Sequence, residues 1–548
     1  MDFGKTPLQH FFHHVEHRPN SFFLHQPVAG KKVGITWGQA GEEVRKIAHV
    51  LQSKGIQKGD RVALVSKNCA WWILTDLAIM MSGAVSVPIY PNVNAEILSY
   101  ILEHSGSKMM FAGKLDTWDD IKPGVPAGMP IIGFPYYEAS GSESWNALLE
   151  STEPLERYEE RAMDNMLTII YTSGTTGKPK GVVHNLSSFT YAMNMFPENI
   201  DAGDHNERAM SYLPLAHIAE RALIELGSLE RGSSIYFSES LETFVEDIKY
   251  ACPTIFGGVP RIWMKLRMGI LAKMDEKKLD RMLKIPFVSK MVQKKVKEGL
   301  GLHESKLFLT GAAPTPPPLA KWYRKVGIPL LEVYGMTENT AYSHCNRQGN
   351  MRIGSAGLPL EGVEVKFSEE KEILMKTHAL MAGYYKEPEL TAEVMEDGFF
   401  KTGDVGHLDK DGFLFITGRV KEIFKTSKGK YVSPASIEGK LLKHSWLDQA
   451  CVTGGSLPQP LVLVVLSEIG KAQPQGSVEK ELETLLAEVN PLLEKHEKMK
   501  TMVVLDDEWT IESGALTPTM KLKRPIIEKW YAQHHEKWDD LPETVVFA

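Results

Sequence analysis

Short apolar runs and amphipathic stretches alternate along the first part of the chain. Arg61–Val65 has the pattern of a buried strand, Ala70–Met81 that of a helix, and Ala84–Tyr90 that of a second strand. A further helix is predicted from Ile97 to Leu102, and a further strand from Met109 to Ala112. This alternation favours parallel sheets covered by helices, whose ligands bind beyond the carboxyl ends of the strands.

The first segment has the periodicity of an amphipathic helix. Its apolar positions are Leu8, Phe11, Phe12 and Val15. The histidines fall between them, at His10, His13, His14 and His17. Histidines four apart could bind a metal, but no carboxylate or cysteine completes a recognisable motif, so we expect a solvated helix face. Residues 114–165 are irregular, and we expect connecting structure there.

Composition narrows the class of protein. The 548 residues, 43% hydrophobic and 24% charged, are typical of a globular chain with several structural units, and they exclude a disordered one. The net charge of −7 argues against a general nucleic-acid binder, because phosphate backbones attract basic surfaces. Local sites for small anions remain possible.

Cysteine spacing and apolar run length bear on the location. Cys69, Cys252, Cys345 and Cys451 show neither zinc-ligand nor CxxC spacing, so we expect buried, reduced thiols. The most apolar stretch, Trp71–Met81, is much shorter than the roughly 20 residues that cross a bilayer. We therefore expect a soluble cytoplasmic protein, or one peripheral to a membrane.

The segment 261–298 has an unusual charge balance. It holds 12 Lys or Arg against 4 Asp or Glu, with methionines interleaved. A solvated helical face is the ordinary explanation. A contact with an anionic membrane, or a patch near a phosphate-bearing ligand, is the alternative.

A loop rich in glycine, hydroxyl and lysine side chains follows the apolar run Leu167–Tyr171. It contains Thr172, Ser173, Gly174, Thr175, Thr176, Gly177, Lys178, Lys180 and Gly181. Glycines allow backbone N–H groups to point at an anion, hydroxyls bond phosphate oxygens, and lysines add charge. It is not a Walker A loop, because Gly174 and Gly177 are only three apart and Pro179 follows Lys178.

This string resembles the phosphate-binding signature of the adenylate-forming (AMP-binding) superfamily. Further segments match that family's motifs in order: LTGAAPT at 309–315, LLEVYGMTEN at 330–339, KTGD at 401–404, DGFLFITGRVKEIFKTSKGK at 411–430 and LTPTMKLKR at 516–524. Two others, SYLPLAHIAER at 211–221 and PTIFGGVPRIWMK at 253–265, resemble the long-chain fatty acyl-CoA synthetase branch.

The resemblance implies a set of site residues. The nucleotide and its neighbours would contact Thr172, Ser173, Gly174, Thr176, Gly177, Lys178, Gly311, Ala312, Ala313, Glu332, Val333, Tyr334, Gly335, Met336, Thr337, Asp404, Arg419, Lys425 and Tyr431. Magnesium would bind Thr172 and Glu338. Catalytic positions would be Lys521, His217, Thr175 and Lys421. Taken alone, a lone histidine is more often structural, and a carboxylate such as Glu338 more often starts a helix.

The resemblance also implies the fold and the reaction. The fold would be α/β: a large N-terminal region, 1–419, with parallel-sheet αβα layers and a small β-barrel-like sub-domain, and a mobile α+β domain, 420–548. The reaction would join a fatty acid to coenzyme A at the expense of ATP, with magnesium. Transfer to a carrier protein or another acceptor, and a non-catalytic binding protein, remain alternatives. Arg221 stands near a position where some family members place a gate tryptophan, so chain length and tunnel gating stay open.

Overall fold

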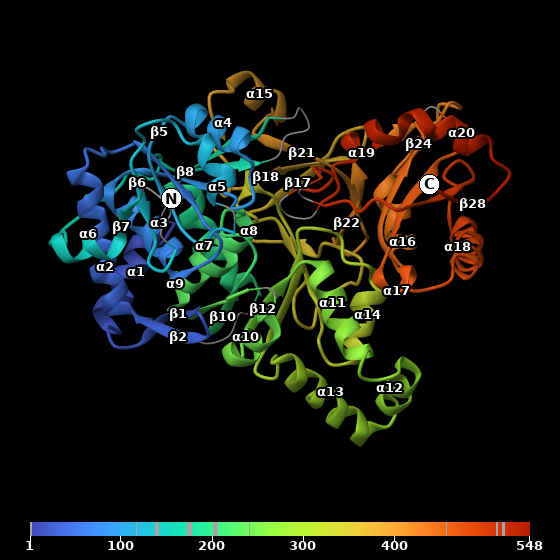
Figure 1. Ribbon diagram of the computed structural model, residues 1–548, viewed down its shortest axis with the longest axis horizontal. Coiled ribbons are helices and arrows are strands. Elements are labelled where there is room, and N and C mark those ends of the chain that lie inside the picture. The colour runs from blue at the N-terminus through green and yellow to red at the C-terminus, as the bar shows by residue number, and fades with distance from the viewer. Residues whose placement is uncertain are drawn as a thin grey trace.

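The computed structural model describes residues 3–116, 118–137, 142–172, 178–200, 207–240, 242–455, 457–510, 513–517 and 521–548. Figure 1 shows two large parallel-sheet layers with their helices in the N-terminal part, and the C-terminal strands and helices gathered at one end. Among the described residues, no helix combines the length and apolar composition needed to cross a membrane.

The first sheet has eight strands in the order β19-β9-β8-β4-β3-β5-β6-β7. Strands β3 to β8 run parallel to one another. Strand β9 pairs antiparallel with β8 on one side and with β19 on the other. The strands are β3 (Arg61–Val65), β4 (Val85–Ile89), β5 (Ser107–Ala112), β6 (Ile131–Gly133), β7 (Glu143–Ser144), β8 (Met166–Thr172), β9 (Lys180–Asn185) and β19 (Gly383–Tyr384). The fully apolar runs predicted as buried strands are its centre.

The second sheet has nine strands in the order β16-β15-β14-β13-β12-β10-β11-β1-β2. Its middle strands, from β1 to β14, are parallel. The strands are β1 (Phe22–Val28), β2 (Lys31–Thr36), β10 (Arg208–Ser211), β11 (Ser234–Phe237), β12 (Ile255–Gly258), β13 (Leu307–Gly311), β14 (Leu331–Tyr334), β15 (His344–Cys345) and β16 (Leu358–Pro359).

Helices fill the space between these sheets. Every residue of α3 (Ala70–Ser82) is buried, because this helix packs against β3 and β4 of one sheet and β1 of the other. Such burial explains why the segment is apolar all round rather than on one stripe. The neighbouring elements are α1 (Pro7–His17), α2 (Trp37–Ser53), α4 (Ala95–Ser105), α5 (Trp118–Ile121), η1 (Lys122–Gly124), α6 (Trp145–Ser151), α7 (Leu186–Ile200), α8 (Ile218–Glu220), the π-helical turn η2 (Arg221–Leu226) and α9 (Gly227–Arg231).

A group of helices begins beside β10, β11 and β12 of the nine-stranded sheet. It comprises α10 (Phe244–Ala251), α11 (Pro260–Leu271), α12 (Glu276–Leu283), α13 (Pro286–Leu300) and α14 (Pro317–Lys325). Figure 1 shows α12 and α13 extending away from the rest of the molecule. Their inner faces pack on a core that includes Leu279, Val292 and Val296.

An antiparallel sheet adjoins the parallel layers. Its order is β17-β18-β21-β20, with β22 also paired to β21. The elements are β17 (Glu364–Phe367), β18 (Glu372–Lys376), α15 (Pro388–Val394), β20 (Met395–Glu396), β21 (Phe399–Leu408) and β22 (Leu414–Arg419). This sheet corresponds to the predicted barrel-like sub-domain.

The C-terminal part has a four-stranded mixed sheet with one core on each face. Alternate residues of β26 point to opposite sides, so Val462 and Val464 join one core and Leu463 and Val465 the other. The elements are β23 (Phe424–Lys425), β24 (Tyr431–Val432), α16 (Pro434–Leu441), β25 (Leu447–Thr453), β26 (Leu461–Leu466), α17 (Glu468–Lys471), α18 (Gln475–Val489), η4 (Asn490–Leu492), β27 (Met502–Leu505), α19 (Arg524–Tyr531), η5 (Ala532–His534), α20 (His535–Asp540) and β28 (Val545–Phe547). An ion pair of 2.7 Å joins Arg261 Nη2 of α11 to Asp448 Oδ2 of β25.

The predicted α/β fold class is confirmed, and three local expectations are wrong. His14 is buried and its Nε2 lies 2.9 Å from the Leu229 carbonyl oxygen, while His10 Nε2 lies 2.9 Å from Asn194 Oδ1, so the histidine face is not simply solvated. Residues 114–165 are not only connections, because β6 and β7 extend the first sheet. All four thiols are free, but Cys252 is partly exposed rather than buried.

Candidate active site

One cavity of about 1860 Å³ runs between the N-terminal and C-terminal parts. Its walls come from the ends of β8, β13 and β14, from the turn after β22, and from the loop before α19. The ends of β8, β13 and β14 are carboxyl ends of parallel strands, where a sheet of this kind is expected to bind ligands.

The phosphate loop begins where β8 ends. Thr172 pairs with Lys180 across β8 and β9, and both line the cavity. Lys180 Nζ lies 4.4 Å from the centre of the Tyr384 ring; burial lowers the pKa of this lysine, and the nearby Glu338 carboxylate opposes that shift. Lys178 Nζ lies 5.3 Å from the Tyr100 ring centre, away from the cavity wall. The intervening positions, Ser173, Gly174, Thr175, Thr176 and Gly177, lie outside the described residues.

The loops after β13 and β14 bring backbone close to the cavity. A Cβ on Gly311 would lie 2.6 Å from the Val333 carbonyl oxygen, and one on Gly335 would lie 2.4 Å from the Ala341 carbonyl carbon, so both positions require glycine. Ala312 adopts a left-handed conformation with φ 62°. The cavity wall here consists of Gly311, Ala312, Ala313, Glu332, Val333, Tyr334, Gly335, Met336 and Thr337. Burial raises the pKa of Glu332 to about 8.

Asp404 is held between two partners. The Tyr334 hydroxyl donates to Asp404 Oδ2 at 2.7 Å, and Arg419 Nε donates to Asp404 Oδ1 at 2.9 Å. The paired registration of β21 and β22 places Asp404 opposite Arg419. Burial, followed by the neighbouring Asp404 charge, raises the pKa of Tyr334 well above its ordinary value, so the phenol stays protonated and can donate. This arrangement fixes an aromatic ring beside a carboxylate.

Glu338 lies in the turn η3 (Thr337–Asn339), which follows β14. Its Oε1 accepts a hydrogen bond of 2.9 Å from the Tyr384 hydroxyl, and its carbonyl oxygen accepts from Met381 N at 2.7 Å. The side chain therefore has a fixed orientation at the cavity wall. A carboxylate so held is a suitable ligand for a hard cation.

His217 lines the cavity and is the residue that caps the start of α8. Its Nδ1 accepts from Ala219 N at 3.2 Å, which leaves Nε2 to carry the proton of the neutral ring. Burial, and the charge of Lys521, lower the pKa of His217 to about 3, so the ring is neutral at ordinary pH. A neutral imidazole with a free Nε2–H can donate to a carboxylate oxygen.

Beside His217 lies a polar cluster that the sequence did not reveal. Glu220 Oε1 accepts from Ser211 Oγ at 2.9 Å, from Tyr212 N at 2.9 Å and from Asn68 Nδ2 at 3.3 Å. Burial raises the pKa of Glu220 to about 8. Asn68 and Glu220 are far apart in the chain, and only the position of Glu220 within the motif SYLPLAHIAER gave a signal.

Lys521 reaches the cavity from the C-terminal part. Solvent enters the cleft around it, yet surrounding protein atoms and the charge of Arg419 lower the pKa of its ammonium. Its backbone is held by a pair of hydrogen bonds with Thr517, of 2.8 Å and 3.0 Å. A lysine so placed adds positive charge near His217, Asp404 and Glu338.

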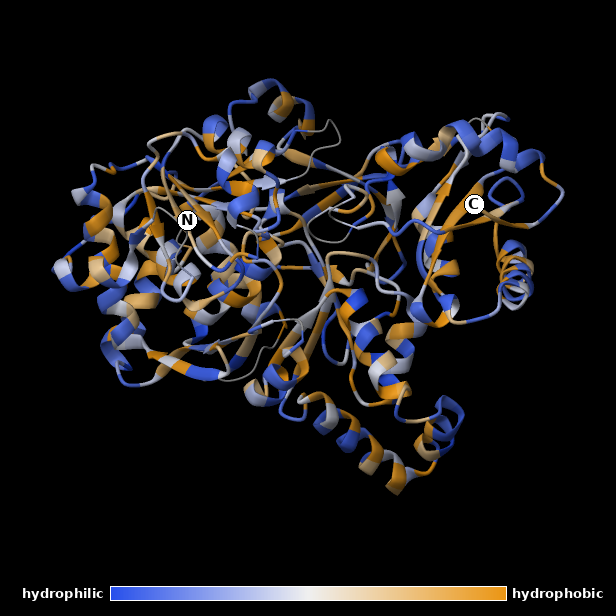
Figure 2. Cartoon of the chain, in the orientation of Figure 1, coloured by the Kyte–Doolittle hydropathy of each residue, from blue (hydrophilic) through white to orange (hydrophobic). Residues whose placement is uncertain are grey.

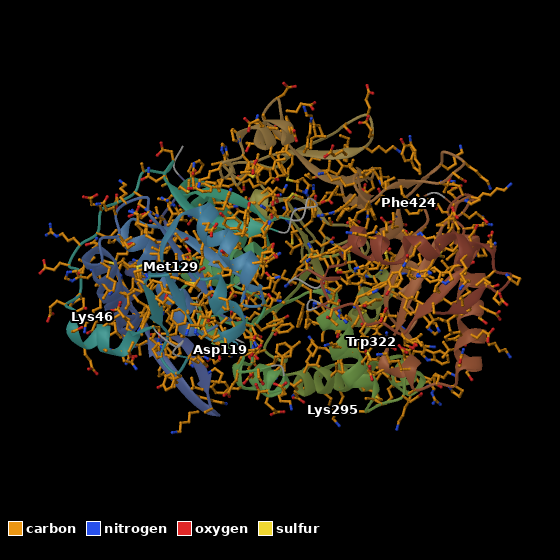
Figure 3. All side chains as sticks on the ribbon, turned by 45° about the horizontal axis from the view of Figure 1, so that its top comes forward. Lys46, Asp119, Met129, Lys295, Trp322 and Phe424 are labelled. Carbon is orange, nitrogen blue, oxygen red and sulfur yellow. The ribbon has the colours of Figure 1, made fainter. Side chains whose placement is uncertain are left out.

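Not every predicted residue reaches the cavity. Lys421, in the turn after β22, lines it. Lys425 and Tyr431 face each other across β23 and β24, with Lys425 Nζ 4.8 Å from the Tyr431 ring centre, and Tyr431 is 61% exposed. Figure 3 labels the neighbouring Phe424 on the C-terminal part. The roles of these residues stay predictions.

Part of the cavity wall is apolar. Its residues include Phe196, Ile200, Leu223, Ile224, Ile255 and Leu309. Arg221 is not part of the cavity wall: its side chain is fully buried, with Nη2 2.6 Å from Asp76 Oδ2. The arginine that was considered above in connection with a gate therefore lies outside the cavity wall.

Two family models match the chain. One for AMP-binding enzymes matches residues 11–385, and one for the AMP-binding enzyme C-terminal domain matches residues 421–537. Among curated proteins, the long-chain-fatty-acid–CoA ligase FadD15 of Mycobacterium bovis is 28% identical, over 96% of this chain and 95% of its own. The long chain acyl-CoA synthetase 2 of Arabidopsis thaliana is 28% identical, over 96% of this chain and 91% of its own.

Solved structures show the same fold. The anthranilate CoA ligase AuaEII in complex with anthranoyl-AMP has a TM-score of 0.80 at 19% identity, covering 97% of this chain and 98% of that one. A Mycobacterium tuberculosis fatty acyl CoA synthetase has a TM-score of 0.66 at 23% identity, covering 96% and 98%. Since a family model matches well over half of its residues, the chain belongs to the AMP-binding enzyme family.

Proposed function

We propose that the protein is an ATP-dependent, AMP-forming fatty acyl-CoA synthetase. A fatty carboxylate attacks the α-phosphorus of ATP and releases diphosphate; the thiol of coenzyme A then attacks the acyl carbon of the acyl-adenylate and releases AMP. The observation that carries the proposal is the cavity, whose wall combines apolar side chains such as Leu223, Ile224 and Leu309 with Tyr334, Asp404 and Lys521. The curated relatives named as long-chain acyl-CoA ligases support the substrate class.

The nucleotide would be positioned by groups that are already in place. Tyr334 offers a ring face to adenine, and the Asp404 carboxylate, flanked by Arg419, can accept from ribose hydroxyls. Gly311, Ala312 and Ala313 leave room for a flat ring or the start of a chain. Thr172 and Lys180 would contact the phosphates, together with Lys178 and the loop residues outside the described part.

The reacting carboxylate would lie between His217 and Lys521. Neutral His217 would donate from Nε2 to one carboxylate oxygen without drawing away its negative charge. The Lys521 ammonium would stabilise the charge that grows on the α-phosphate in the transition state. Alignment of the reactants in the cleft would contribute further to the acceleration.

Magnesium fits the acidic side of this site. Glu338 would hold it, with the Thr172 hydroxyl as a second oxygen ligand. When bound, the ion neutralises charge on the phosphates. The fixed carboxylate orientation set by Tyr384 is the feature of this chain that supports the assignment.

Glu338→Gln is expected to raise the magnesium concentration for half-maximal diphosphate release by roughly tenfold or more, because an amide oxygen carries no charge for the cation. Tyr384→Phe is the matched control: it removes the 2.9 Å hydrogen bond and keeps the carboxylate, so its shift should be smaller. Equal magnesium dependence in Glu338→Gln and the parent protein would remove Glu338 from the metal site.

We further propose a boundary near Arg419 and rotation of the C-terminal part about Lys421 between the two half-reactions. The Thr426–Tyr431 loop, with Lys425, would then approach the cleft from its present exposed position.

Lys421→Pro is expected to keep diphosphate release while the thioester step from supplied acyl-AMP falls at least tenfold, since proline fixes φ near −65°. Lys421→Ala should retain both steps. Within the described residues, the Lys421 N–H donates no hydrogen bond, so the folded state loses none to proline. Comparable rates of both half-reactions in Lys421→Pro would exclude this hinge.

The acceptor is the second point of the proposal. A product assay with coenzyme A or a carrier protein as acceptor decides it: we expect the acyl thioester of coenzyme A. Failure to release diphosphate with any fatty acid would overturn the proposal as a whole. We place the enzyme in the cytoplasm or at a membrane surface, with the basic segment 261–298 as the part that meets the lipid.

A further inference from the structure

The tip of the projecting helical arm exposes large apolar side chains. Phe287 is 92% exposed, Ile285 54% and Met291 53%. Ile285 lies in the turn between α12 and α13, and Phe287 lies in the first turn of α13. Met291 lies one helical turn further along α13. A cluster of this size at a protruding point is uncommon for a surface that meets only water.

The arm is folded rather than loosely attached. Val292, Val296 and Leu300 of α13 are buried against the core of the arm, and Gln293 Nε2 donates to the Lys325 carbonyl oxygen at 3.0 Å. Residues four apart share a helix face, so Phe287 and Met291 lie on the face opposite to these contacts. The exposed cluster is therefore presented at a fixed place. Figure 1 shows the turn between α12 and α13 at the far end of the arm, and Figure 2 shows orange, hydrophobic ribbon there.

Basic side chains surround the apolar tip. The exposed ones nearest to it are Arg281, Lys284, Lys290, Lys294 and Lys295. Figure 3 labels Lys295 at the outer edge of the molecule. Across the described ranges, Lys284, Lys290 and Lys295 form no ion pair, and Lys294 only approaches Glu298 at 3.8 Å.

We propose that this tip is a membrane anchor: Ile285, Phe287 and Met291 insert among the acyl chains of an anionic lipid surface, and the surrounding lysines bind its headgroups. A tip-to-tip contact with a second copy would bring these basic side chains together, whereas an anionic lipid surface complements them, so charge favours the lipid. The inference extends the proposed function, because fatty acids partition into membranes, but its test does not depend on activity.

The test is partition of the full chain onto vesicles, measured by sedimentation. Vesicles of phosphatidylcholine alone are compared with vesicles containing about a third phosphatidylserine, the fraction chosen to give an anionic surface. We expect binding to the second kind only. The variant Ile285→Ser/Phe287→Ser should bind roughly tenfold or more weakly, since two exposed apolar side chains no longer leave water. Each of Lys284→Ala and Lys290→Ala should weaken binding roughly fivefold.

Leu492→Ser is the matched control, because Leu492 is 66% exposed but lies on the C-terminal part. It should bind like the parent chain. Thermal unfolding and diphosphate release with a water-soluble fatty acid should be unchanged in the tip variants. Equal partition of the tip variants, equal binding to both vesicle types, or self-association that the tip variants abolish would each overturn the proposal. If the unsubstituted protein releases no diphosphate, the proposed enzyme function is wrong, whereas the proposed membrane anchor is not affected.

Discussion

Lys521→Ala is expected to reduce acyl-adenylate formation by roughly a hundred- to a thousandfold, the usual effect of removing one group that stabilises transition-state charge. Surrounding protein atoms and the charge of Arg419 lower the pKa of this ammonium, and Lys521 lines the cavity in which the α-phosphate would lie. The measurement is diphosphate release with saturating ATP. Thioester formation from supplied acyl-AMP should be nearly unchanged.

Measuring adenylation and thioester formation separately distinguishes a catalytic effect of the Lys521→Ala substitution from a loss of stability. Lys529→Ala is the matched control, because Lys529 lies on α19 close in sequence but outside the cavity wall. It should keep both steps. Equal losses of both half-reactions in Lys521→Ala would mean that the lysine supports the fold or the binding of AMP rather than adenylation.

Arg221→Met is expected to destabilise the N-terminal part by about 3–5 kcal/mol, because it removes one partner of a fully buried charge pair. Arg221 Nη2 lies 2.6 Å from Asp76 Oδ2, Nη1 donates to Thr168 Oγ1 at 2.7 Å, and Nε lies 3.3 Å from Glu225 Oε2. The side chains of Arg221, Asp76 and Glu225 are all inaccessible to solvent. The measurement is the urea midpoint of tryptophan fluorescence.

Glu225 provides a sharper comparison. Burial and the nearby Asp76 raise the pKa of Glu225 well above its ordinary value, which favours a protonated Glu225 and leaves Arg221 to balance Asp76. Glu225→Gln should therefore cost less than about 1 kcal/mol, because it replaces one neutral group by another. If Glu225→Gln unfolds as early as Arg221→Met, Glu225 is charged in the native state; if Arg221→Met matches the parent midpoint, the pair contributes no stability.

The sequence predicts best where one physical rule decides. Strand β3 is apolar after its first residue, and β5 is apolar from Met109 onward. Helix α4 begins after Asn94, which caps it, and ends at Gly106 with φ 65°. The existence of these elements therefore follows from the local pattern. Gly311 and Gly335 lie in recognised motifs, and the structure adds the close backbone contacts that require glycine.

Other features depend on contacts between distant segments. His14 sits on the polar side of its helix by periodicity, yet α9, more than two hundred residues later, covers it. Glu220 gains its environment from Asn68, and Arg221 its partner from Asp76. The charge of segment 261–298 was readable, whereas the exposure of Phe287 was not, because no local pattern states which face of a helix remains uncovered.

The single ion pair described between α11 and β25 has a thermodynamic consequence. Arg261 and Asp448 are both partly exposed, so their contact is worth only about 0–1 kcal/mol and weakens as salt is added. In the rotation proposed above, breaking this ion pair would therefore cost little free energy. Bound ligands, rather than the empty protein, would then set the ratio between the two populations, and a differential affinity of only tenfold would shift that ratio by the same factor.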